Sequence, residues 1–401
     1  MSKFNTICVI GLGYIGLPTA SLLGTKGYSV LGVDISEDVV TTINRGEIHI
    51  IEPDLDLLVK SAVNSGNLRA ATCPEKADIF IIAVPTPFKN SHKPDLSYVE
   101  SATRAIAPYV QPGNLIILES TCPVGTTDYV AEILREEGLD TQKDVYVAHC
   151  PERVLPGRIL IELIQNDRIV GGINKISTSV ASSFYREFVS GEVLETDAKT
   201  AELSKLTENS FRDVNIAFAN ELSLICDQEN IDVWELIRLA NHHPRVNILK
   251  PGPGVGGHCI AVDPWFIIDR AGDTARLIRS AREVNDSKPH WVVEKTLKKA
   301  QKFKRPTIAC LGIAFKADVD DLRESPALNI VNALKDYDIA DLIVCEPNIE
   351  NHEEFQLTSL DQAVNCADII LILVDHKEFS SLTSFALNEK IVIDTRGITK
   401  Q

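Results

Sequence analysis

The sequence predicts an α/β protein in which two Rossmann-like, doubly wound parallel-sheet domains are joined by a helical middle domain. Three observations predict this fold. The first part of the chain alternates short apolar runs with segments of helical length, the pattern of a buried parallel sheet. A long stretch without glycine or proline follows, as in a helical domain. Strand-like runs then return in an order that echoes the first domain, which indicates two related sheets.

The first domain, placed at residues 1–198, opens with the apolar run Ile7–Ile10 and the segment Gly11-Leu-Gly-Tyr-Ile-Gly16. A helix-like stretch follows, and a second strand, Ser29–Val33, ends at Asp34. Three more strands are expected, at residues 79–84, 115–118 and 145–148. Because the strands alternate with segments of helical length, they should form one parallel sheet covered by helices.

The middle domain, placed at residues 199–303, should be helical. Ala201–Gln228 contains neither glycine nor proline, and Thr274–Lys302 contains one proline, Pro289, which should end or kink a helix. Between these helices, the glycines and prolines of residues 250–259 must form a loop.

The last domain, placed at residues 304–401, repeats the strand pattern of the first. The runs 307–312, 342–346 and 367–374 resemble 7–11, 30–34 and 77–84. Where the first domain has its glycine-rich turn, the last has Gly-Ile-Ala-Phe-Lys316. It should therefore bind a nucleotide-like ligand in a different way.

Composition and charge exclude several classes of protein. The 401 residues are 44% hydrophobic and 24% charged, typical of a globular chain with two or three domains. Forty Lys and Arg against 56 Asp and Glu leave a formal charge of −16, so no nucleic-acid partner is expected. The apolar runs fall far short of the roughly 20 residues of a membrane span, and the first residues lack a signal-peptide pattern.

The cysteines predict a reducing environment. There are nine, an odd number without C-x-x-C spacing, and several lie in apolar strand-like runs. We expect buried, reduced thiols, with neither disulfides nor a metal site. Together with the lack of a span or signal, this predicts a cytoplasmic protein with no membrane partner.

The glycine-rich segment predicts a dinucleotide site because of its context. It follows a strand, opens a helix and has Asp34 at the end of the next strand. Gly11, Gly13 and Gly16 allow a tight turn and let backbone N–H groups approach a pyrophosphate at the helix N-terminus. Asp34 can accept hydrogen bonds from a ribose diol and repels a 2′-phosphate, so NAD is favoured over NADP.

Four further residues are expected near this cofactor. Tyr14 and Ile15 stand at the helix entry. Thr86, in Val-Pro-Thr-Pro, and Thr121, in Glu-Ser-Thr-Cys-Pro-Val-Gly-Thr, follow strands whose carboxyl ends share one edge of the sheet, where ligands bind. Their hydroxyls could contact the nicotinamide ribose or the reacting centre, although capping a turn is an equally common role.

Two other segments carry groups suited to chemistry. Glu152 and Arg153 follow the strand at 145–148. Lys205, Asn209 and Arg212 are spaced i, i+4, i+7, so they share one face of a helix. A polar helix face usually contacts solvent, which is the alternative interpretation.

Cys259 is a candidate nucleophile. It emerges from a glycine-rich loop, with His258 beside it and Asp263 four residues later, whereas a structural cysteine prefers apolar packing inside an element. The alternative is a loop cysteine with no role.

Taken together, these motifs resemble the nucleotide-sugar 6-dehydrogenases over essentially the whole chain. The resemblance rests on the following segments, in this order: the G-x-G-x-x-G start, the V-P-T-P and S-T-x-P-V-G-T loops, the P-E-R loop, the Lys-x-x-x-Asn helix, the G-G-H-C loop with its Asp, and the Phe-Lys…Arg-Glu-Ser-Pro segment. Segments 42–50, 151–157, 207–222 and 241–249 are most similar to members that act on UDP-N-acetyl-D-mannosamine.

The resemblance implies a four-electron oxidation of UDP-N-acetyl-D-mannosamine at C6 to UDP-N-acetyl-D-mannosaminuronate, with two NAD. Cys259 would add to the intermediate aldehyde, forming a thiohemiacetal and then a thioester that water hydrolyses. Lys205 would handle the alcohol proton, and Lys205 and Asn209 would stabilise oxyanions. Glu152 would activate the water, and Asp263 would order Lys205 or that water.

The resemblance also implies the binding residues and the assembly. Domain one would bind NAD, domain three the UDP-sugar, and the middle domain would supply the catalytic loop and form a homodimer. Arg323 would reach the cofactor, and His243 and Arg245 would serve the partner subunit's site. The expected UDP-sugar contacts are Arg153, Val154, Lys205, Asn209, Arg212, His243, Arg245, Gly256, Phe315 and Lys316. The product would enter a surface polysaccharide.

Three alternatives remain open. The same chemistry could act on UDP-N-acetylglucosamine or UDP-glucose, because discrimination at C2 depends on a few contacts. An ordinary two-electron NAD dehydrogenase for a small hydroxy acid would not need Cys259, but the duplicated last domain argues against it. A non-catalytic protein that senses NAD or a nucleotide would need no reactive thiol either.

Overall fold

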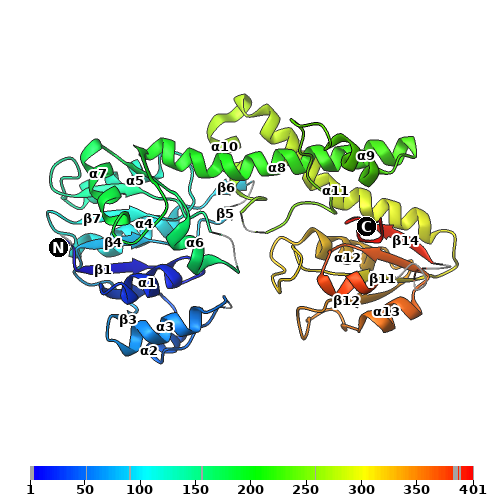
Figure 1. The fold of residues 1–401 in the computed structure, drawn as a ribbon, viewed down its shortest axis with the longest axis horizontal. Helices are drawn as coiled ribbons and strands as arrows, with labels where there is room; N and C mark the ends of the chain where they lie inside the picture. The colour runs from blue at the N-terminus through cyan, green and yellow to red at the C-terminus, as the bar shows by residue number, and fades with distance from the viewer. Residues whose placement is uncertain are drawn as a thin grey trace. The chain divides into compact units, whose positions relative to one another are not determined.

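The computed structural model describes residues 4–50, 52–89, 92–154, 157–257, 259–382, 387 and 390–400. The chain forms two compact units, residues 1–207 and residues 208–401. Helix α8 (Ala198–Glu229) contributes to both of them. Each unit contains one large parallel or mostly parallel sheet (Figure 1). The protein is therefore mixed α/β, with a large sheet, a helical middle region and a second sheet, as the sequence predicts.

The described part of the first unit contains an eight-stranded sheet in the order β10-β9-β8-β7-β4-β1-β2-β3. Its strands are β1 (Thr6–Ile10), β2 (Ser29–Val33), β3 (Leu68–Ala71), β4 (Ile79–Ile82), β7 (Leu115–Leu118), β8 (Tyr146–His149), β9 (Arg168–Gly172) and β10 (Val193–Asp197). Within this sheet, the neighbouring strands β8, β7, β4, β1, β2 and β3 are all parallel. β9 pairs antiparallel with β8 and parallel with β10. A separate antiparallel ribbon joins β5 (Phe88–Lys89) and β6 (Lys93–Pro94).

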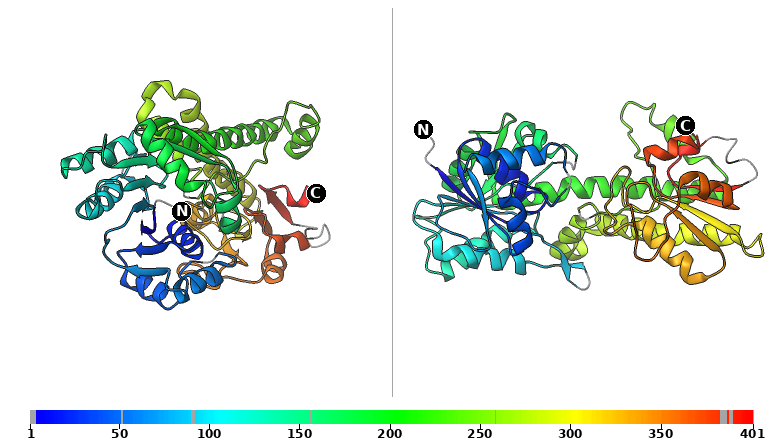
Figure 2. Two further views of the ribbon diagram at one scale, coloured as in Figure 1. Left: turned by 60° about the vertical axis from the view of Figure 1, so that its left-hand side comes forward. Right: turned by 90° about the horizontal axis from the view of Figure 1, so that it is seen from below.

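Alternating residues of these strands face two apolar cores. Val9, Ile81 and Ile117 belong to one core, and Cys8, Phe80 and Ile116 to the other, all of them buried. One face is covered by α1 (Gly16–Thr25), α2 (Glu37–Asn44), α3 (Leu55–Asn64), α6 (Ile159–Gln165) and α7 (Lys175–Tyr185), and the other by α4 (Ser97–Ile106) and α5 (Thr126–Glu136). Figure 2 shows the blue α1 and the cyan α4 and α5 on opposite sides of the sheet. Two covered faces explain why the strands are continuously apolar.

The five strands that the sequence predicts in this unit are confirmed, and three others of the eight-stranded sheet, with the two strands of the ribbon, were not predicted. β10 is a sheet edge with the sequence Val-Leu-Glu-Thr-Asp and is largely exposed, so it lacks the buried apolar signature. β3 and β9 are short and carry an arginine and, in β9, two glycines. The antiparallel pairing of β9 with β8 also departs from the all-parallel expectation.

The second unit begins with helices and ends in a smaller sheet. Its helices are the later part of α8, α9 (Val233–Ala240), α10 (Asp263–Ala271), α11 (Arg276–Ala300), α12 (Pro326–Tyr337) and α13 (Leu360–Cys366). Four parallel strands, β11 (Thr307–Leu311), β12 (Asp341–Cys345), β13 (Ile369–Ile372) and β14 (Ile391–Asp394), lie in the order β12-β11-β13-β14. Residues of α11 and α12 pack on one face, and residues of α13 on the other.

The sequence predicts that Pro289 ends or kinks a helix. The prediction of an end is wrong, because α11 continues through Pro289. A proline inside a helix removes one hydrogen bond to the carbonyl four residues earlier. Here both halves of α11 are held by packing, since Asn285 and Lys288 are buried before the proline and Val292, Val293 and Thr296 after it. Tertiary burial on both sides outweighs the local cost of the missing bond.

The two sheets share one plan. The order β12-β11-β13-β14 matches β2-β1-β4-β7. Asp78 Oδ2 accepts a hydrogen bond from Thr6 N at 2.9 Å, and Asp368 Oδ2 accepts one from Thr307 N at 2.8 Å, so the same Ala-Asp-Ile segment caps the same strand in each unit. The internal repeat predicted from the sequence is confirmed.

Two predictions from composition can be compared with the structure. None of the nine cysteines is in a disulfide, and six of them are buried. In the part of the chain that the structure describes, no helix combines the length and the apolar character needed to cross a membrane.

Candidate active site

The three glycines of the first turn have different surroundings. Gly11 has φ +92°, and a Cβ there would lie 2.7 Å from Ala83 O. A Cβ on Gly16 would lie 1.8 Å from Gly11 O. A Cβ on Gly13 would meet no atom within 4 Å. Gly11 and Gly16 are therefore needed for packing, whereas the space beside Gly13 is open for a ligand to approach the backbone.

The surroundings of this turn fit a dinucleotide. No side chain caps the N-terminus of α1, and its first turn has no acidic residue, so the positive end of the helix is available to an anion. Asp34, at the end of β2, accepts hydrogen bonds from Leu12 N and Ser36 N, each at 3.0 Å. These bonds fix the carboxylate while it stays only half-buried. Tyr14 is 37% exposed and Ile15 is half-buried at the helix entry.

The structure brings the two threonine loops together. Thr86 Oγ1 donates a hydrogen bond to the carbonyl of Thr121 at 2.6 Å, and Ser120 Oγ donates to Val84 O at 2.7 Å. The hydroxyl of Thr86 thus links the loops after β4 and β7. Its oxygen can still accept a hydrogen bond.

Glu202, near the start of α8, anchors the second of these loops. Its carboxylate accepts hydrogen bonds from Gly125 N at 2.6 Å, Thr127 N at 2.7 Å and Thr127 Oγ1 at 2.6 Å. Glu202 is 1% exposed. Nothing in the sequence marks it, because a glutamate in a helix without glycine or proline usually faces solvent.

Glu152 lies in a buried ion pair. Its Oε2 is 2.7 Å from Nη1 of Arg168, and its Oε1 accepts the backbone N–H of Arg153 at 2.7 Å. The side chains of Arg168 and Glu152 are 2% and 5% exposed. The buried guanidinium is thus the charged partner of the Glu152 carboxylate. Arg168 lies in β9, which the sequence does not predict, so its role could not be foreseen.

A second buried carboxylate, Glu119, lies in the same electrostatic network. It accepts a hydrogen bond from the Tyr185 hydroxyl at 2.9 Å. Burial and the charge of Glu152 raise the pKa of Glu119 to about 7, against the opposing effect of Arg168. One buried cation thus faces two carboxylates, and Glu119 titrates near neutral pH.

The loop after Glu152 is tied to the first unit. Arg153 Nη1 donates to Asp167 O at 3.1 Å, and Val154 packs against the apolar core. Beyond residues 155–156, which lie outside the described residues, Glu52 accepts Gly157 N at 2.9 Å and Ile159 N at 2.8 Å. In the same unit, Lys205 is half-buried on α8.

In the second unit the structure joins Asn209 to Asp263. Asn209 Nδ2 donates a hydrogen bond to Asp263 Oδ2, and both side chains are buried. Cys259 lies one turn before Asp263: its carbonyl accepts Val262 N at 3.0 Å and Asp263 N at 2.9 Å, and the residue is exposed. Cys259 thus opens the turn that leads into α10. His258, the predicted neighbour, lies outside the described residues.

The loop that leads to Cys259 is seated on two neighbours. Gly252 N donates to Asn220 Oδ1 at 2.8 Å. A Cβ on Gly256 would lie 2.4 Å from Glu324 O, and one on Gly257, with φ +82°, would lie 2.7 Å from the ring of Phe315. Two of the predicted substrate residues, Gly256 and Phe315, are therefore adjacent, and only glycine fits this contact.

The remaining predicted residues of the second unit are mostly exposed. Lys316, Arg212 and His243 are exposed, and Arg245 N donates to His243 Nδ1 at 3.3 Å. Arg323 pairs with the Asp321 carboxylate, with Nη2 2.7 Å from Oδ2. Exposed cations are available to an anionic ligand.

One group of side chains has the composition of a metal site. The ligand atoms of Asp318, His376 and Glu378 lie within 4.8 Å of one another. However, both ring nitrogens of the buried His376 take part in hydrogen bonds, Nδ1 with Asp318 N at 2.9 Å and Nε2 with Glu346 Oε2 at 3.1 Å. A cation here would have to displace these bonds.

Three domain models of one protein family match consecutive parts of this chain. Residues 5–189 match the NAD binding domain of the UDP-glucose/GDP-mannose dehydrogenase family, residues 199–287 its central domain, and residues 309–401 its UDP binding domain. The chain belongs to the UDP-glucose/GDP-mannose dehydrogenase family. It is thus a nucleotide-sugar dehydrogenase that uses NAD, and the resemblance drawn from the motifs is confirmed.

Individual members of the UDP-glucose/GDP-mannose dehydrogenase family are similar over nearly the full length. The chain is 55% identical over 400 residues to the UDP-N-acetyl-D-mannosamine dehydrogenase of Campylobacter jejuni, covering 96% of this chain and 98% of the relative. It is 54% identical over 407 residues to the NDP-N-acetyl-D-galactosaminuronic acid dehydrogenase of Ralstonia nicotianae, covering 98% and 96%. The solved UDP-N-acetyl-mannosamine dehydrogenase of Staphylococcus aureus superposes with a TM-score of 0.91 at 43% identity, over 99% and 96% of the two chains.

Proposed function

We propose that the protein oxidises C6 of UDP-N-acetyl-D-mannosamine to a carboxylate, giving UDP-N-acetyl-D-mannosaminuronate and two NADH. The observation that carries this proposal is the placement of Cys259. It is exposed in the turn that precedes α10, four residues before Asp263, whose buried carboxylate accepts a hydrogen bond from Asn209. An enzyme that stops at the aldehyde needs no such nucleophile.

The electrons and atoms balance through a covalent intermediate. NAD, when bound, accepts one hydride in each of two steps. In the first step the C6 alcohol loses a hydride and a proton and becomes an aldehyde. The Cys259 thiolate then adds to the aldehyde carbon, so that this carbon again carries a transferable hydride. Loss of that hydride gives a thioester, and water hydrolyses it to the acid and the free thiol.

Each catalytic residue has a separate role in this proposal. Lys205 accepts or compensates the alcohol proton, and Lys205 with Asn209 stabilises the oxyanions. Glu152 activates the hydrolytic water as a base, and its ion pair with Arg168 holds it in place. Asp263 orients Asn209, because it accepts the hydrogen bond from the Asn209 amide. This adds to the role of Asp263 proposed from the family.

The proposed ligand contacts follow the three family domains. We assign NAD to residues 1–198, the catalytic loop to 199–303 and the UDP-sugar to 304–401. The proposed cofactor contacts are Gly11, Gly13, Tyr14, Ile15, Gly16, Asp34, Thr86, Thr121 and Arg323. The proposed UDP-sugar contacts are Arg153, Val154, Lys205, Asn209, Arg212, His243, Arg245, Gly256, Phe315 and Lys316. Several of these are cations, which suits a diphosphate.

The identity of the sugar is the most specific part of the proposal. The Campylobacter and Staphylococcus relatives favour the mannosamine derivative. The Ralstonia relative, 54% identical, favours an N-acetylgalactosamine derivative as a second candidate. UDP-N-acetylglucosamine and UDP-glucose stay as alternatives, because these sugars differ in a few contacts worth only a few kcal/mol.

We also propose a homodimer formed through the middle region. Phe211, Phe218 and Ile225 repeat every seven residues on α8 and are 68%, 54% and 46% exposed. A stripe of large apolar side chains at this spacing lies along one side of a helix and is typical of an interface. Nine cysteines without a disulfide suit a reducing compartment such as the cytoplasm.

The experiment is the NADH yield on limiting UDP-N-acetylmannosamine, for the wild type and Cys259→Ser. UDP-N-acetylgalactosamine, UDP-N-acetylglucosamine and UDP-glucose run in parallel. The proposal expects two NADH per sugar, fastest on the mannosamine derivative, and loss of turnover to the acid in the variant. One NADH per sugar, or a variant that forms the acid at the normal rate, would contradict the cysteine mechanism. A higher kcat/KM on another sugar would reassign the substrate.

A further inference from the structure

The acid at the end of β12 stands where the first unit has its ribose-binding candidate. Asp34 follows β2, and Glu346 follows β12, the matching strand of the second sheet. The turn after the first strand is held in the same way in both units, since Gly11 N donates to Val33 O at 2.8 Å and Gly312 N to Cys345 O at 2.9 Å. The two carboxylates can therefore be compared directly.

The hydrogen-bond acceptor sites of the Glu346 carboxylate are all occupied by protein groups, unlike those of Asp34. Its Oε2 accepts Ile313 N at 2.8 Å and Ala314 N at 3.0 Å and lies 3.1 Å from His376 Nε2. Its Oε1 accepts Asn348 N at 3.1 Å and Asn348 Nδ2 at 3.4 Å. Each carboxylate oxygen offers about two lone-pair sites, so none is left for a ribose diol. Burial opposes the charge of Glu346, yet the hydrogen bonds from His376 and Ile313 hold its pKa below the ordinary value.

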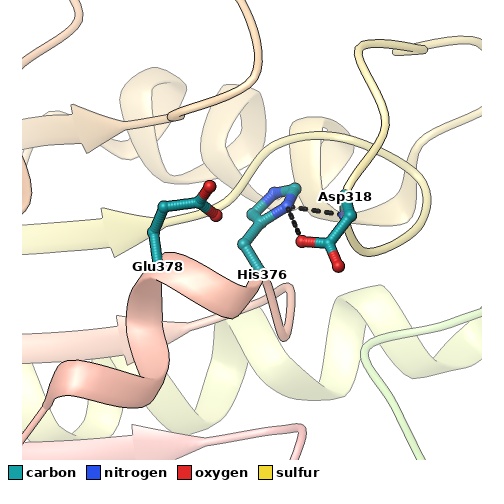
Figure 3. A group of neighbouring side chains, drawn as sticks. All are labelled: Asp318, His376 and Glu378. Carbon is teal, nitrogen blue, oxygen red and sulfur yellow. Dashed lines mark hydrogen bonds and ion pairs between the residues drawn. The ribbon is translucent and has the colours of Figure 1, made fainter.

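His376 extends this support to the far side of the same loop. Its Nδ1 accepts the backbone N–H of Asp318 at 2.9 Å, so Nδ1 carries no proton and Nε2 must donate to Glu346. Asp318 has φ +58°, and its Oδ1 accepts Lys377 N at 3.0 Å. Figure 3 shows the imidazole between Asp318 and Glu378, with its bonds on the Asp318 side.

These contacts bracket the two residues that the proposed function assigns to the UDP-sugar. Ile313 and Ala314 are held before Phe315 and Lys316, and Asp318 is held after them. The supporting pair is buried, with His376 2% and Glu346 4% exposed. A loop with an exposed lysine is thus fixed at both ends by groups that do not face the ligand.

We propose that Glu346 and His376 are positioning residues that hold the Phe315–Lys316 loop in its UDP-binding shape, in place of the ribose contact made by the matching acid of the first unit. This inference rests on the proposed role of Phe315 and Lys316. Preordering the loop removes the entropic cost of ordering it when the ligand binds, so losing the brace should weaken UDP binding.

The test compares His376→Phe, His376→Gln, His352→Phe and Lys316→Ala with the wild type, using UDP as the calorimetric probe. Phenylalanine keeps a ring beside Phe379, whose centroid lies 5.4 Å from that of His376, and removes both nitrogens. Glutamine restores one acceptor and one donor. His352, a half-buried histidine whose Nδ1 accepts Glu354 N at 3.1 Å, is the matched control.

His376→Phe should bind UDP about tenfold more weakly and raise the KM for the UDP-sugar by a similar factor, as expected for lost buried hydrogen bonds. The KM for NAD should stay within about twofold. His376→Gln should recover most of the affinity, and His352→Phe should match the wild type. A merely structural defect would instead change both KM values together.

The outcomes separate this inference from the proposed function. Weak UDP binding in Lys316→Ala with normal binding in His376→Phe would overturn the inference alone. Normal binding in both variants would overturn the loop assignment and the inference together. Should His376→Phe fail to fold, amide exchange in the wild type decides: slow exchange at Ile313, Ala314 and Asp318 supports the brace, and free exchange overturns it.

Discussion

At the residue scale, the three glycines of the first turn are required for different reasons. Gly11 and Gly16 are enforced by the protein's own backbone, because an added Cβ would lie 2.7 Å from Ala83 O and 1.8 Å from Gly11 O. At Gly13 no atom lies within 4 Å of such a Cβ. The motif therefore combines two positions fixed by packing with one that faces open space, where we propose that the cofactor approaches. A pattern of letters does not distinguish these roles.

Gly13→Val should separate these roles. Its side chain would enter open space, so the melting temperature should stay within about 2 °C of the wild type, while the KM for NAD should rise at least tenfold because the pyrophosphate cannot approach. Gly16→Ala is the contrasting variant and should lower the free energy of unfolding by about 2 kcal/mol. A Gly13→Val enzyme with a normal KM for NAD would contradict the proposed cofactor contact.

Glu119 should make stability depend on pH. Its pKa is raised from 4.5 to about 7, mainly by burial, so the folded state binds this proton more tightly than the unfolded chain. Folding takes up the proton between these values, and the stability therefore falls as pH rises through that window, by about 3 kcal/mol from this group.

Glu119→Gln removes that titration and keeps an oxygen to accept from Tyr185. The difference in unfolding free energy between pH 5 and pH 8, measured by urea denaturation, should shift by about 3 kcal/mol, with the variant favoured at pH 8. Parallel pH profiles for the two proteins would show that Glu119 is ionised throughout.

At the scale of elements, helices α8 and α11 hold the catalytic loop through a chain of buried polar groups. Asn220 accepts Gly252 N at 2.8 Å and donates to Asn285 Oδ1 at 2.8 Å. Asn285 Nδ2 donates to Asp213 Oδ1 at 2.8 Å, and Arg282 Nη1 lies 2.6 Å from the same oxygen. Burial raises the pKa of Asp213, but the Arg282 ion pair and these hydrogen bonds stabilise its charge.

Asn220→Ala should loosen this loop. The buried Gly252 N–H and the Asn285 amide would lose their partners, which should lower the free energy of unfolding by about 2 kcal/mol. The rate at which iodoacetamide alkylates Cys259 should also change. Mass spectrometry of the Cys259 peptide separates it from the exposed Cys73 and Cys366. The control is Asn215→Ala on the same helix, which removes only a bond to Phe211 O. Equal alkylation rates in the two variants would rule out the anchoring role.

Local signals predict some elements and miss others for physical reasons. β1, β2, β4, β7 and β8 are buried apolar runs, so their composition reveals them. β10 is a largely exposed edge strand, so its residues lack the buried apolar run that marks the other strands. Pro289 predicts a break in α11 that burial of both halves overrides. Periodicity reports burial, and therefore fails wherever pairing rather than burial forms the element.

At the scale of the whole molecule, the chain uses one sheet plan twice with different loops. The four matching strands have the same order in both sheets. Asp34, beside the first turn, is half-buried, whereas Glu346, beside the second, accepts hydrogen bonds from the loop next to it. The sheet with Asp34 lies in the NAD binding domain and the sheet with Glu346 in the UDP binding domain.

The exposed apolar stripe on α8 predicts the assembly. Phe218→Glu should convert a dimer into monomers in sedimentation velocity at micromolar concentration, because it places a charge in an apolar contact. Leu57→Glu, at a residue 64% exposed in the first unit, is the matched control and should remain dimeric. A wild type that sediments as a monomer, or a dimeric Phe218→Glu, would place the interface elsewhere.

The chemistry proposed for the site is inferred largely from local sequence. The glycine turn, the acid after the second strand and the loop with Cys259 are short segments whose residue types and spacing predict their roles before any fold is known. The partners of these groups are long-range: Arg168 for Glu152, Glu202 for the loop after β7, Asn220 for Gly252 and His376 for Asp318. Only the tertiary structure identifies them, because a buried polar group is satisfied by whatever the fold brings within hydrogen-bond distance, and sequence spacing does not encode that distance.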